Sequence, residues 1–520
     1  MANHSTNWPR FDRRTLLTGA LGLAGLSLPR YSSGRLLQTP RFSSTPFTLG
    51  VASGEPTDSG VVLWTRLAPD PINGGGMEAV DVQTSWEIAR DEQMRDIVQS
   101  GAAVAPATLG HSIHVEVDGL EPDRWYWYRF HAGNETSRTG RTRTLPGAGS
   151  SSSQLRFAFA SCQHYEQGHF TAYDHMSRED IDLVFHLGDY IYEYEGREGR
   201  VRQHTGDEIE LLQDYRNRHA LYRTDEHLQE AHAAFPWFVT WDDHEVDNNY
   251  AANISEDGLP SELFLRRRAE AYQAYYEHMP LRRTSMPTGP NMHLYRDFRW
   301  GTLGAFHILD TRQYRTDQPC GDQRGPACDG VFDEEATLLG DEQERWLLDG
   351  LNQSGARWNV IPQQLLMARV DRMPGDAELI GMDVWSGYEV ARRRLMEFLQ
   401  TRRPSNPIVL TGDIHTNWVT DLQVDYRNAN GPIVGTEFVG TSISSSGDGS
   451  DVTDTTEQML AENPWVKFFN AQRGYVTCTL TPEQYRSDYK VLDYVTRPGS
   501  PISTRASFVV ENGQPGAIRA

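Results

Sequence analysis

Two Gly-Asp pairs, each directly after an apolar run, constrain the fold of this 520-residue chain more than any other feature. Gly188-Asp189 follows residues 181–187, and Gly412-Asp413 follows residues 407–411. An apolar run that ends in Gly-Asp predicts a buried strand with a carboxylate at its C-terminal edge, where open α/β sheets carry their sites. The acidic stretch 240–245 follows a third apolar run. The pattern therefore predicts oxygen ligands gathered at one sheet edge, which is the layout of a dinuclear metal site.

The chain is acidic, with a formal net charge of −22. This charge argues against a nucleic acid, or an anionic membrane surface, as a partner held by nonspecific attraction. Dinuclear metal sites hydrolyse phosphate esters. Such an anionic substrate would need a local positive field, which the bound metal ions would supply. Beyond the N-terminus no stretch is long and apolar enough to predict a membrane span.

The N-terminus predicts a targeting segment. Residues 10–14 are basic and contain Arg13-Arg14, and residues 15–28 form a short, mildly apolar run. This combination is typical of a twin-arginine signal, so we expect the export machinery as a partner and a secreted, periplasmic or cell-wall location. A chance arginine pair before a leader-like run is the alternative.

The texture of the chain changes along its length and predicts several domains. After a signal and leader (1–45), short alternating runs predict an all-β, immunoglobulin- or fibronectin-like sandwich (46–145). A Gly/Ser-rich linker (146–154) precedes an α/β catalytic domain (155–520) with layered strands and helices. The predicted helices of that domain span residues 207–234, 260–278, 341–351 and 388–401. The Gly/Pro/Ser-rich segment 498–520 is expected to be loop-like.

The four cysteines predict different roles. Cys320 and Cys328 lie eight residues apart in a Gly/Pro-rich stretch, which in an exported protein predicts a local disulfide. Cys478 lies in a strand-like run and is expected to be a small buried side chain. Cys162 ends a predicted core strand and is considered below with the metal site.

The ordered set of motifs resembles the PhoD-type alkaline phosphatase and phosphodiesterase family, within the calcineurin-like and purple-acid-phosphatase-like metallophosphoesterase superfamily. The resemblance covers nearly the whole chain. It implies a layered metallophosphoesterase-type β-sandwich flanked by helices. The segments that carry it are Ala160-Ser-Cys-Gln163, Gly188-Asp-Tyr-Ile-Tyr192, Trp241-Asp-Asp-His-Glu-Val-Asp-Asn-Asn249, Gly412-Asp-Ile-His415 and Gly440-Thr-Ser-Ile-Ser-Ser-Ser-Gly447.

The Gly-Asp-x-x-Tyr motif predicts the first metal position. Its spacing suits Asp189 as a bridge between two metals and Tyr192 as a phenolate ligand to one of them. A phenolate favours a trivalent ion, so ferric iron is expected. The resemblance implies Cys162 as a thiolate ligand of the same iron, and an ordinary buried thiol is the alternative. His415 would complete the iron shell or bind at the second position.

The second metal position is richer in oxygen than the superfamily pattern. Asp243, Gln363 and Asp413 stand where that pattern has nitrogen or neutral donors. Oxygen ligands favour calcium over zinc or divalent iron, so one or more calcium ions are expected, as the resemblance also implies. Asp242 and Asp247 could instead be helix-capping or loop residues.

Three further residues are expected to act on the substrate. His244 corresponds to a histidine that contacts the substrate or leaving oxygen in such enzymes, where it would protonate the leaving alkoxide or stabilise the transferring phosphoryl group. A supporting position beside Asp242 is the alternative for it. Asn248 and Arg312 would bind phosphate oxygens, although a structural salt bridge would equally explain Arg312.

The predicted function is hydrolysis of phosphomonoesters, phosphodiesters or both by a metal-bound hydroxide at a mixed iron/calcium centre. Related sequences also make a phospholipase D-like or teichoic-acid phosphodiesterase an alternative. A cell-wall- or carbohydrate-binding protein with structural metals is the alternative from another class. A structural site would not need Cys162, Tyr192 and His244 in the superfamily order.

Overall fold

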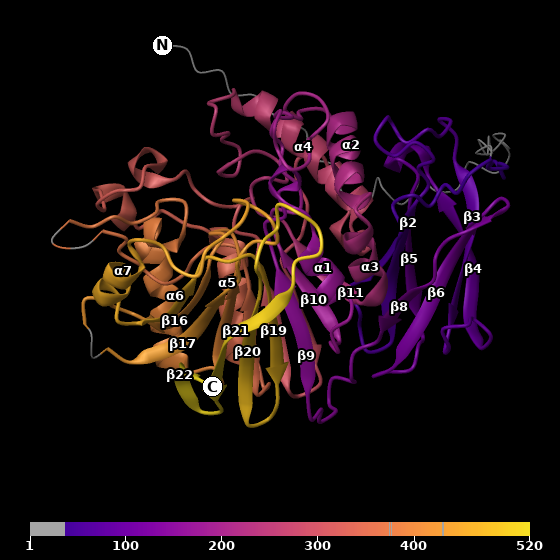
Figure 1. The fold of residues 1–520 in the computed structure, drawn as a ribbon. Helices are drawn as coiled ribbons and strands as arrows, with labels where there is room; N and C mark the ends of the chain where they lie inside the picture. Colours follow the sequence, from indigo (N-terminus) through magenta and orange to yellow (C-terminus); the bar gives the residue numbers. More distant parts are fainter. Residues whose placement is uncertain (1–36, 374, 376, 429–430) are drawn as a thin grey trace, which may run out of the picture. The chain divides into compact units, whose positions relative to one another are not determined.

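Three β-sheets organise the part of the chain that the computed structural model describes, residues 37–373, 375, 377–428 and 431–520 (Figure 1). The largest has ten strands in the order β22-β21-β20-β19-β9-β10-β11-β1-β2-β5. The second has seven, in the order β12-β13-β14-β15-β17-β16-β18. The third has the order β4-β3-β6-β7, and β8 also pairs with β6.

The strands of the ten-stranded sheet are β1 (Val51–Gly54), β2 (Gly60–Arg66), β5 (Ser112–Asp118), β9 (Leu155–Ala160), β10 (Leu183–Leu187), β11 (Pro236–Thr240), β19 (Gly474–Leu480), β20 (Gln484–Leu492), β21 (Ile502–Glu511) and β22 (Gln514–Arg519). Those of the seven-stranded sheet are β12 (Arg296–Trp300), β13 (Gly304–Ile308), β14 (Trp358–Pro362), β15 (Pro407–Thr411), β16 (Asn417–Gln423), β17 (Ile433–Val439) and β18 (Val466–Asn470). The third sheet contains β3 (Val82–Ala89), β4 (Ile97–Ala105), β6 (Trp125–Ala132), β7 (Glu135–Thr136) and β8 (Gly140–Arg143).

The α-helices are α1 (Thr171–Met176), α2 (Leu212–Arg223), α3 (Glu226–Ala234), α4 (Ser261–His278), α5 (Gly340–Gln353), α6 (Glu389–Arg402) and α7 (Thr456–Glu462). Short 3-10 turns are η1 (Ala107–Leu109), η2 (Tyr165–Gln167), η3 (Arg283–Ser285), η4 (Pro319–Asp322), η5 (Asp329–Phe332) and η6 (Trp385–Gly387).

One predicted helix is wrong in its continuity. The sequence pattern over 207–234 predicts a single helix, whereas the structure has α2 and α3 with a break at residues 224–225. The Asp225 side chain accepts hydrogen bonds from the backbone N–H groups of His227 and Leu228, at 3.0 and 3.2 Å. An aspartate in this position caps a new helix, which explains why the apolar pattern alone misses the break.

The two large sheets pack face to face through a core rich in phenylalanine. The ring centroids of Phe238 (β11) and Phe298 (β12) lie 4.0 Å apart, and those of Phe185 (β10) and Phe306 (β13) lie 5.5 Å apart. Helices α1 to α4 lie beside β10 and β11, and α5 and α6 lie beside the seven-stranded sheet (Figure 1). The coarse expectation of several sheets with flanking helices is therefore confirmed.

The central strands of both large sheets are parallel, and this places the loops that follow them at one edge. Strands β9, β10, β11 and β1 pair in parallel in one sheet, and β13, β14, β15 and β17 do so in the other. A parallel bridge between Ser161 and Ser442 joins the segments that follow β9 and β17. The carboxyl ends of strands from both sheets therefore meet, which is where α/β sheets carry ligands.

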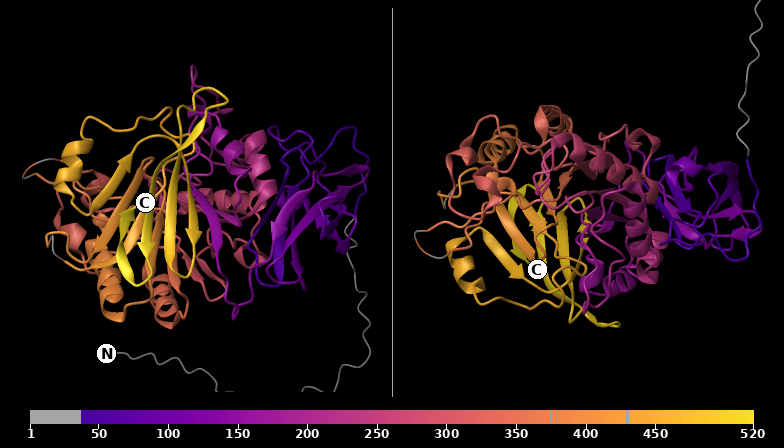
Figure 2. Two further views of the ribbon diagram at one scale, coloured as in Figure 1. Left: turned by 60° about the horizontal axis from the view of Figure 1, so that its bottom comes forward. Right: turned by 90° about the horizontal axis from the view of Figure 1, so that it is seen from above.

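The strands of the N-terminal β segment are divided between two sheets. Strands β1, β2 and β5 extend the ten-stranded sheet through the parallel pairing of β1 with β11. Strands β3, β4, β6, β7 and β8 form the third sheet, and the two groups share one apolar core (Figure 2). The immunoglobulin-like character and the predicted domain boundaries, including a linker at 146–154, stay predictions.

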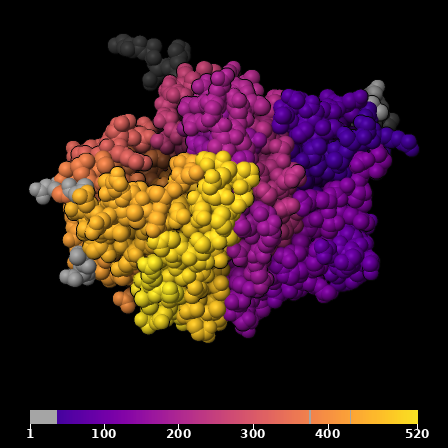
Figure 3. Space-filling model, viewed as in Figure 1, coloured from indigo at the N-terminus to yellow at the C-terminus, as the bar shows by residue number. Residues whose placement is uncertain are grey.

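The C-terminal segment corrects a second expectation. Residues 502–511 and 514–519 form β21 and β22 at an edge of the ten-stranded sheet, not a loop. The yellow C-terminal residues lie between the orange and magenta segments on the face in Figure 3. Among the described residues no helix is long and apolar enough to cross a membrane. The twin-arginine motif lies outside the described residues.

Candidate metal centre

The predicted ligands lie where the parallel strands end. Cys162 follows β9, Asp189 follows β10, Asp243 follows β11, and Asp413 and His415 follow β15. Cys162, Asp189, Asp413 and His415 have φ angles of 58°, 57°, 62° and 55°. Such left-handed conformations are uncommon for residues other than glycine and cluster at functional sites, because the surrounding structure must hold them.

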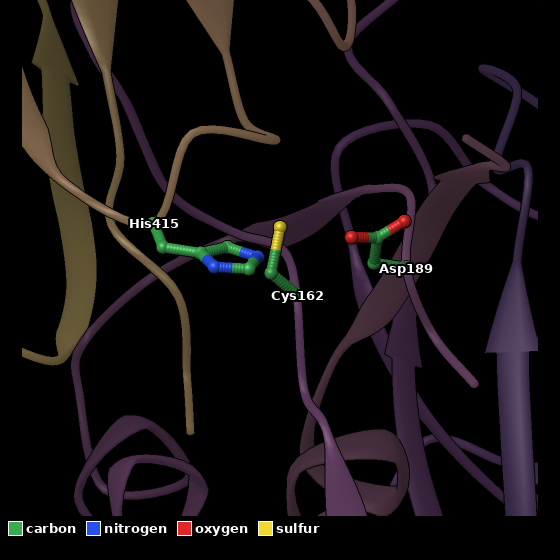
Figure 4. A group of neighbouring side chains, drawn as sticks. All are labelled: Cys162, Asp189 and His415. Atoms are coloured by element: carbon green, nitrogen blue, oxygen red, sulfur yellow. The ribbon is translucent and has the colours of Figure 1, made fainter. Parts of the chain in front are cut away.

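Three of these side chains form one compact group. The ligand atoms of Cys162, Asp189 and His415 all lie within 4.8 Å of one another. Figure 4 shows the Cys162 sulfur between the His415 imidazole and the Asp189 carboxylate. Cys162 and Asp189 are each 1% exposed, so water screens them little. A thiol, a carboxylate and an imidazole from two sheets could therefore hold one cation.

Tyr192 belongs to the same neighbourhood. Its hydroxyl donates a hydrogen bond to Asp189 Oδ2 at 2.8 Å and lies 3.2 Å from His415 Nε2. The Ser445 hydroxyl lies 2.7 Å from both the Tyr192 hydroxyl and the Cys162 carbonyl oxygen. The phenol oxygen thus faces the group that contains the thiol.

Asp189 also belongs to a second group, with Asp243 and His244, whose ligand atoms lie within 4.8 Å of one another. Buried oxygens here have no hydrogen-bond partner among the described residues: Asp189 Oδ1, Asp242 Oδ2 and Asp243 Oδ1. Asp243 Oδ1 still lies 3.6 Å from an Arg312 nitrogen, whereas buried carboxylate oxygens without any partner are costly unless a cation is bound, so Asp189 Oδ1 in particular points to a ligand. Because Asp189 belongs to both groups, the two candidate metal positions lie next to each other.

His244 is held by a carboxylate that the sequence interpretation missed. Glu193 Oε2 lies 2.8 Å from His244 Nδ1, and Glu193 is 1% exposed. Burial would lower the pKa of His244, but Glu193, Asp243 and Asp189 raise it well above its usual value. The imidazole is thereby favoured in its protonated form.

Ionisation of the first group is unfavourable without a nearby positive charge. Burial, with the neighbouring carboxylates, raises the pKa of Asp189 well above its usual value. Burial likewise raises the pKa of the Cys162 thiol and of the Tyr192 phenol well above their usual values. Burial and the charge of Asp243 raise the pKa of Asp413 to about 7. A bound cation would reverse this balance, so the donor set fits a metal better than it fits an apolar interior.

Asp413 is close to both groups but belongs to neither. It lines a cavity beside them together with Asn249 and Asp383. Its carboxyl is a remaining oxygen donor at this edge, directly after β15. The side chain can therefore be reached from the cavity as well as from the two groups.

The side-chain amide of Gln363 has hydrogen-bond partners inside the protein. Its Oε1 accepts hydrogen bonds from the Leu365 N–H at 2.9 Å and the Trp385 Nε1–H at 3.1 Å. Its amide nitrogen donates to the Thr411 hydroxyl at 2.6 Å and to the Leu365 carbonyl oxygen. These internal partners already use both ends of the buried amide, so they do not favour a ligand role, and that role stays a prediction.

Asn248 and Arg312 are also engaged elsewhere. The Asn248 amide donates to Glu256. The Arg312 guanidinium is fully buried, makes two hydrogen bonds to Asp383 at 2.8 and 2.9 Å, and also donates to Asp242. This geometry matches the structural salt-bridge interpretation of Arg312 and leaves it as a support for the acidic stretch.

Two further residues position the strand ends. Glu245 accepts hydrogen bonds from the backbone N–H groups of Asp189, Tyr190 and Asp242, and so fixes the ends of β10 and β11 together. Arg473 donates to the carbonyl oxygens of His415 and Gly447. The position of Glu245 inside the Asp-Asp-His-Glu motif could have identified it, whereas Arg473 lies in no motif.

Comparisons with known proteins identify the family of this chain. The PhoD-like phosphatase family model matches residues 157–489, and the model of the PhoD-like phosphatase N-terminal domain matches residues 32–146. Alkaline phosphatase D of Bacillus subtilis (strain 168) is 53% identical over 516 residues, with 97% of this chain and 88% of that protein covered. A solved structure described as PhoD is 54% identical, has a TM-score of 0.91, and is covered over 93% of its chain and 92% of this one.

The fold and these matches define an enzyme of the phosphoric ester hydrolase class. Within that class, the chain belongs to the PhoD-like phosphatase family.

Proposed function

We propose that this chain is an exported phosphatase that hydrolyses phosphomonoesters, phosphodiesters or both at a centre of ferric iron and calcium. The position of Asp189 is the observation that carries the proposal. This residue belongs to both ligand groups, and its Oδ1 is buried with no hydrogen-bond partner among the described residues. A carboxylate in this position is suited to bridge two cations.

The two groups differ in the softness of their donors, which supports two different ions. Cys162, Tyr192 and His415 supply sulfur, phenol and imidazole donors on one side of Asp189. Asp243, with Asp242 and Asp413 nearby, supplies carboxylates on the other side. Thiolate and phenolate favour iron in its ferric form, and carboxylates favour calcium. Bound there, the cations would neutralise the phosphoryl oxygens and acidify the attacking water.

The protein's own contribution to the reaction is a positioned acid. Glu193 holds Nδ1 of His244, and the ring's other nitrogen remains to donate a proton to the leaving oxygen. Because Glu193 favours the imidazolium, the ring can hold the proton that it would donate. Burial of Glu193 and His244 limits the competition of bulk water for this contact.

Export is the second part of the proposal. Its supports are Arg13-Arg14 before a short apolar run and the disulfide between Cys320 and Cys328. Disulfides form and persist outside the reducing cytosol. The twin-arginine route carries folded proteins, which suits an enzyme that acquires its metal before export.

The test combines metal analysis with hydrolysis. Elemental analysis of the purified protein should find iron and calcium, and a chelator should abolish release of nitrophenol from nitrophenyl phosphate or its bis-ester. Asp189→Asn should lose both metals and reduce kcat more than about a hundredfold, because supporting residues alone cost 10–100-fold. Asp297→Asn, at an exposed site in β12, is the matched control. Zinc or manganese in place of iron and calcium would refute the assignment of the metals.

A further inference from the structure

A cavity of about 150 Å³ adjoins the candidate centre and contains two arginines, Arg324 and Arg372. Asp413 lines the same cavity, so the cavity opens beside the proposed reaction site. Its volume corresponds to roughly ten water-sized spheres, which leaves room for a phosphate group. Neither the proposed chemistry nor the ligand groups use these two arginines.

The carboxylates that line this cavity have other partners. Asp383 is held by Arg312 at 2.8 Å and by Arg315 at 3.0 Å. Asp322 accepts a hydrogen bond from Asn249 Nδ2 at 2.6 Å. Asp413 lies at the metal-facing end. Asp383 is therefore paired with arginines other than Arg324 and Arg372, and Asp322 is held by a neutral amide.

Arg324 and Arg372 have no ion pair with any described carboxylate, although they share one cavity. Arg372 is half-buried, with its guanidinium 5.6 Å from the Trp418 ring centroid, and Arg324 is exposed. Burial, followed by the charge of Arg324, lowers the pKa of Arg372 to about 10. Two arginines at one cavity, without partners among the described carboxylates, are suited to bind an anion.

We propose that this cavity binds a second phosphate group of the ester substrate, on the leaving-group side of the ester that reacts at Asp189. This inference rests on the proposed function. It assigns to Arg324 and Arg372 a role in selecting esters with two phosphate groups over esters with one. Arginine suits this role because its planar donors match phosphate oxygens in pairs. The apolar side chains of Val370 and Met382 in the lining strengthen such contacts by excluding water.

The experiment uses two substrates that differ only in the second phosphate. These are propane-1,3-diol bisphosphate, whose two esters are equivalent, and propane-1,3-diol monophosphate. The wild-type enzyme should have at least a tenfold lower KM for the bisphosphate, with similar kcat per ester. Arg372→Gln should raise the KM for the bisphosphate about tenfold, as expected for loss of a charge-assisted hydrogen bond, and change the monophosphate less than twofold.

Two further variants keep the test decisive. Arg324→Gln removes an exposed side chain and should act in the same direction even where Arg372→Gln lowers stability. Arg402→Gln, at an exposed position at the end of α6, is the matched control and should change neither substrate. Equal KM values for both substrates in the wild type, or equal losses on both in the variants, would overturn the proposal.

A binding measurement separates this inference from the proposed function. Propane-1,3-diyl bisphosphonate and propylphosphonate are not hydrolysed, and calorimetry can compare their affinities for the metal-loaded protein. A preference for the bisphosphonate that is lost in both arginine variants supports the cavity, even where neither ester is a substrate. Equal affinities, or a preference that survives both variants, overturn it. Inorganic phosphate at matched concentration is the competitor that distinguishes capture of a free anion from capture of the substrate's own second group.

Discussion

At the scale of single residues, the site combines donors that rarely occur together in a core. Cys162 and Cys478 are both free and buried, yet their surroundings differ. Cys478 lies 3.0 Å from the Tyr485 hydroxyl and 3.7 Å from the Ser487 hydroxyl, within the core of the ten-stranded sheet. Cys162 instead lies among a carboxylate and an imidazole. The two cysteines therefore provide a matched pair for experiment.

The first prediction concerns this pair. Cys162→Ser should lower the iron content and abolish a visible thiolate-to-metal absorption band, because serine is a poor substitute for a soft thiolate ligand. Cys478→Ser should leave both unchanged. The measurements are elemental analysis and an absorption spectrum of each purified protein. Iron retained in full by Cys162→Ser would return this residue to the role of a buried thiol.

The second prediction concerns Glu193. Glu193→Gln should lower kcat about 10–100-fold, as expected for a residue that positions an active group. It should also lower the pKa of His244, because the carboxylate that does most to raise this pKa is removed. An acid with a lower pKa loses its proton at a lower pH, so the fall in kcat on the alkaline side should move to lower pH. A pH profile of kcat measures this shift, with Glu334→Gln as an exposed control. An unchanged profile would mean that Glu193 has a packing role only.

Residue-level prediction succeeded where the signal was local. Cys162, Asp189, Tyr192 and His415 stand in short motifs at strand ends, and the structure brings them together. Glu193 was missed because its partner His244 lies 51 residues away in sequence. The internal bond of Gln363 to Trp385 could not be foreseen either, because Trp385 comes from a distant turn, η6. Contacts of this kind depend on tertiary packing and leave no local pattern.

At the scale of elements, strand ends and the loops after them carry the site. The loop between η4 and η5 is closed by the predicted disulfide, Cys320–Cys328, which the structure confirms. This loop also supplies Asp322, whose carboxylate accepts a hydrogen bond from Asn249. Asn249 in turn donates its backbone N–H to Asp243 at 2.8 Å. The disulfide therefore supports the acidic stretch indirectly.

The third prediction follows from this loop. Replacing Cys320 and Cys328 together by serine should reduce the free energy of unfolding by about 2–3 kcal/mol, as the chain-entropy model gives for a short closed loop. The metal content should persist, because neither residue belongs to a ligand group. Denaturant unfolding with and without reductant measures the effect, and reductant should alter the wild type alone. A variant as stable as the wild type would show that packing of η5 fixes this loop without the bond.

Element prediction from sequence was most accurate for buried strands. The apolar runs before Asp189 and Asp413 correspond to β10 and β15, both fully buried. It failed at 498–520, where Gly, Pro and Ser predict a loop and the structure has β21 and β22. β22 is the edge strand and is largely exposed, and β21 alternates buried with half-buried positions, so neither strand needs a continuous apolar run.

At the scale of residues 37–520, the ten-stranded sheet ties the N-terminal β segment to the catalytic part. Strand β1 pairs with β11, with Ser53 opposite Pro236 and Gly54 opposite Trp237. Removal of the N-terminal segment would leave β11 as an unpaired edge directly before Asp243. Exposed edges of this kind promote aggregation.

The fourth prediction is that residues 151–520 alone do not fold into a soluble, metal-containing protein. The expected result is an aggregated product, because the apolar edge of β11 and the side of α3 that contacts β8 become exposed. Sedimentation and elemental analysis of the refolded fragment check this, with the chain from residue 37 onward as the control. A monomeric fragment that binds metal would establish residues 151–520 as an independent domain.

The parallel bridge between Ser161 and Ser442 lies next to the candidate centre, at the edge where the two large sheets meet. The proposed ligands are divided between these sheets, with Cys162 and Asp189 on one and His415 on the other. An ion bound between them would stabilise the packing of the two sheets at this edge, as the phenylalanine core stabilises it in the middle. Loss of the ion would then allow the sheets to separate first beside the catalytic groups. The bound ion that the reaction needs would thus also determine which part of the protein unfolds first.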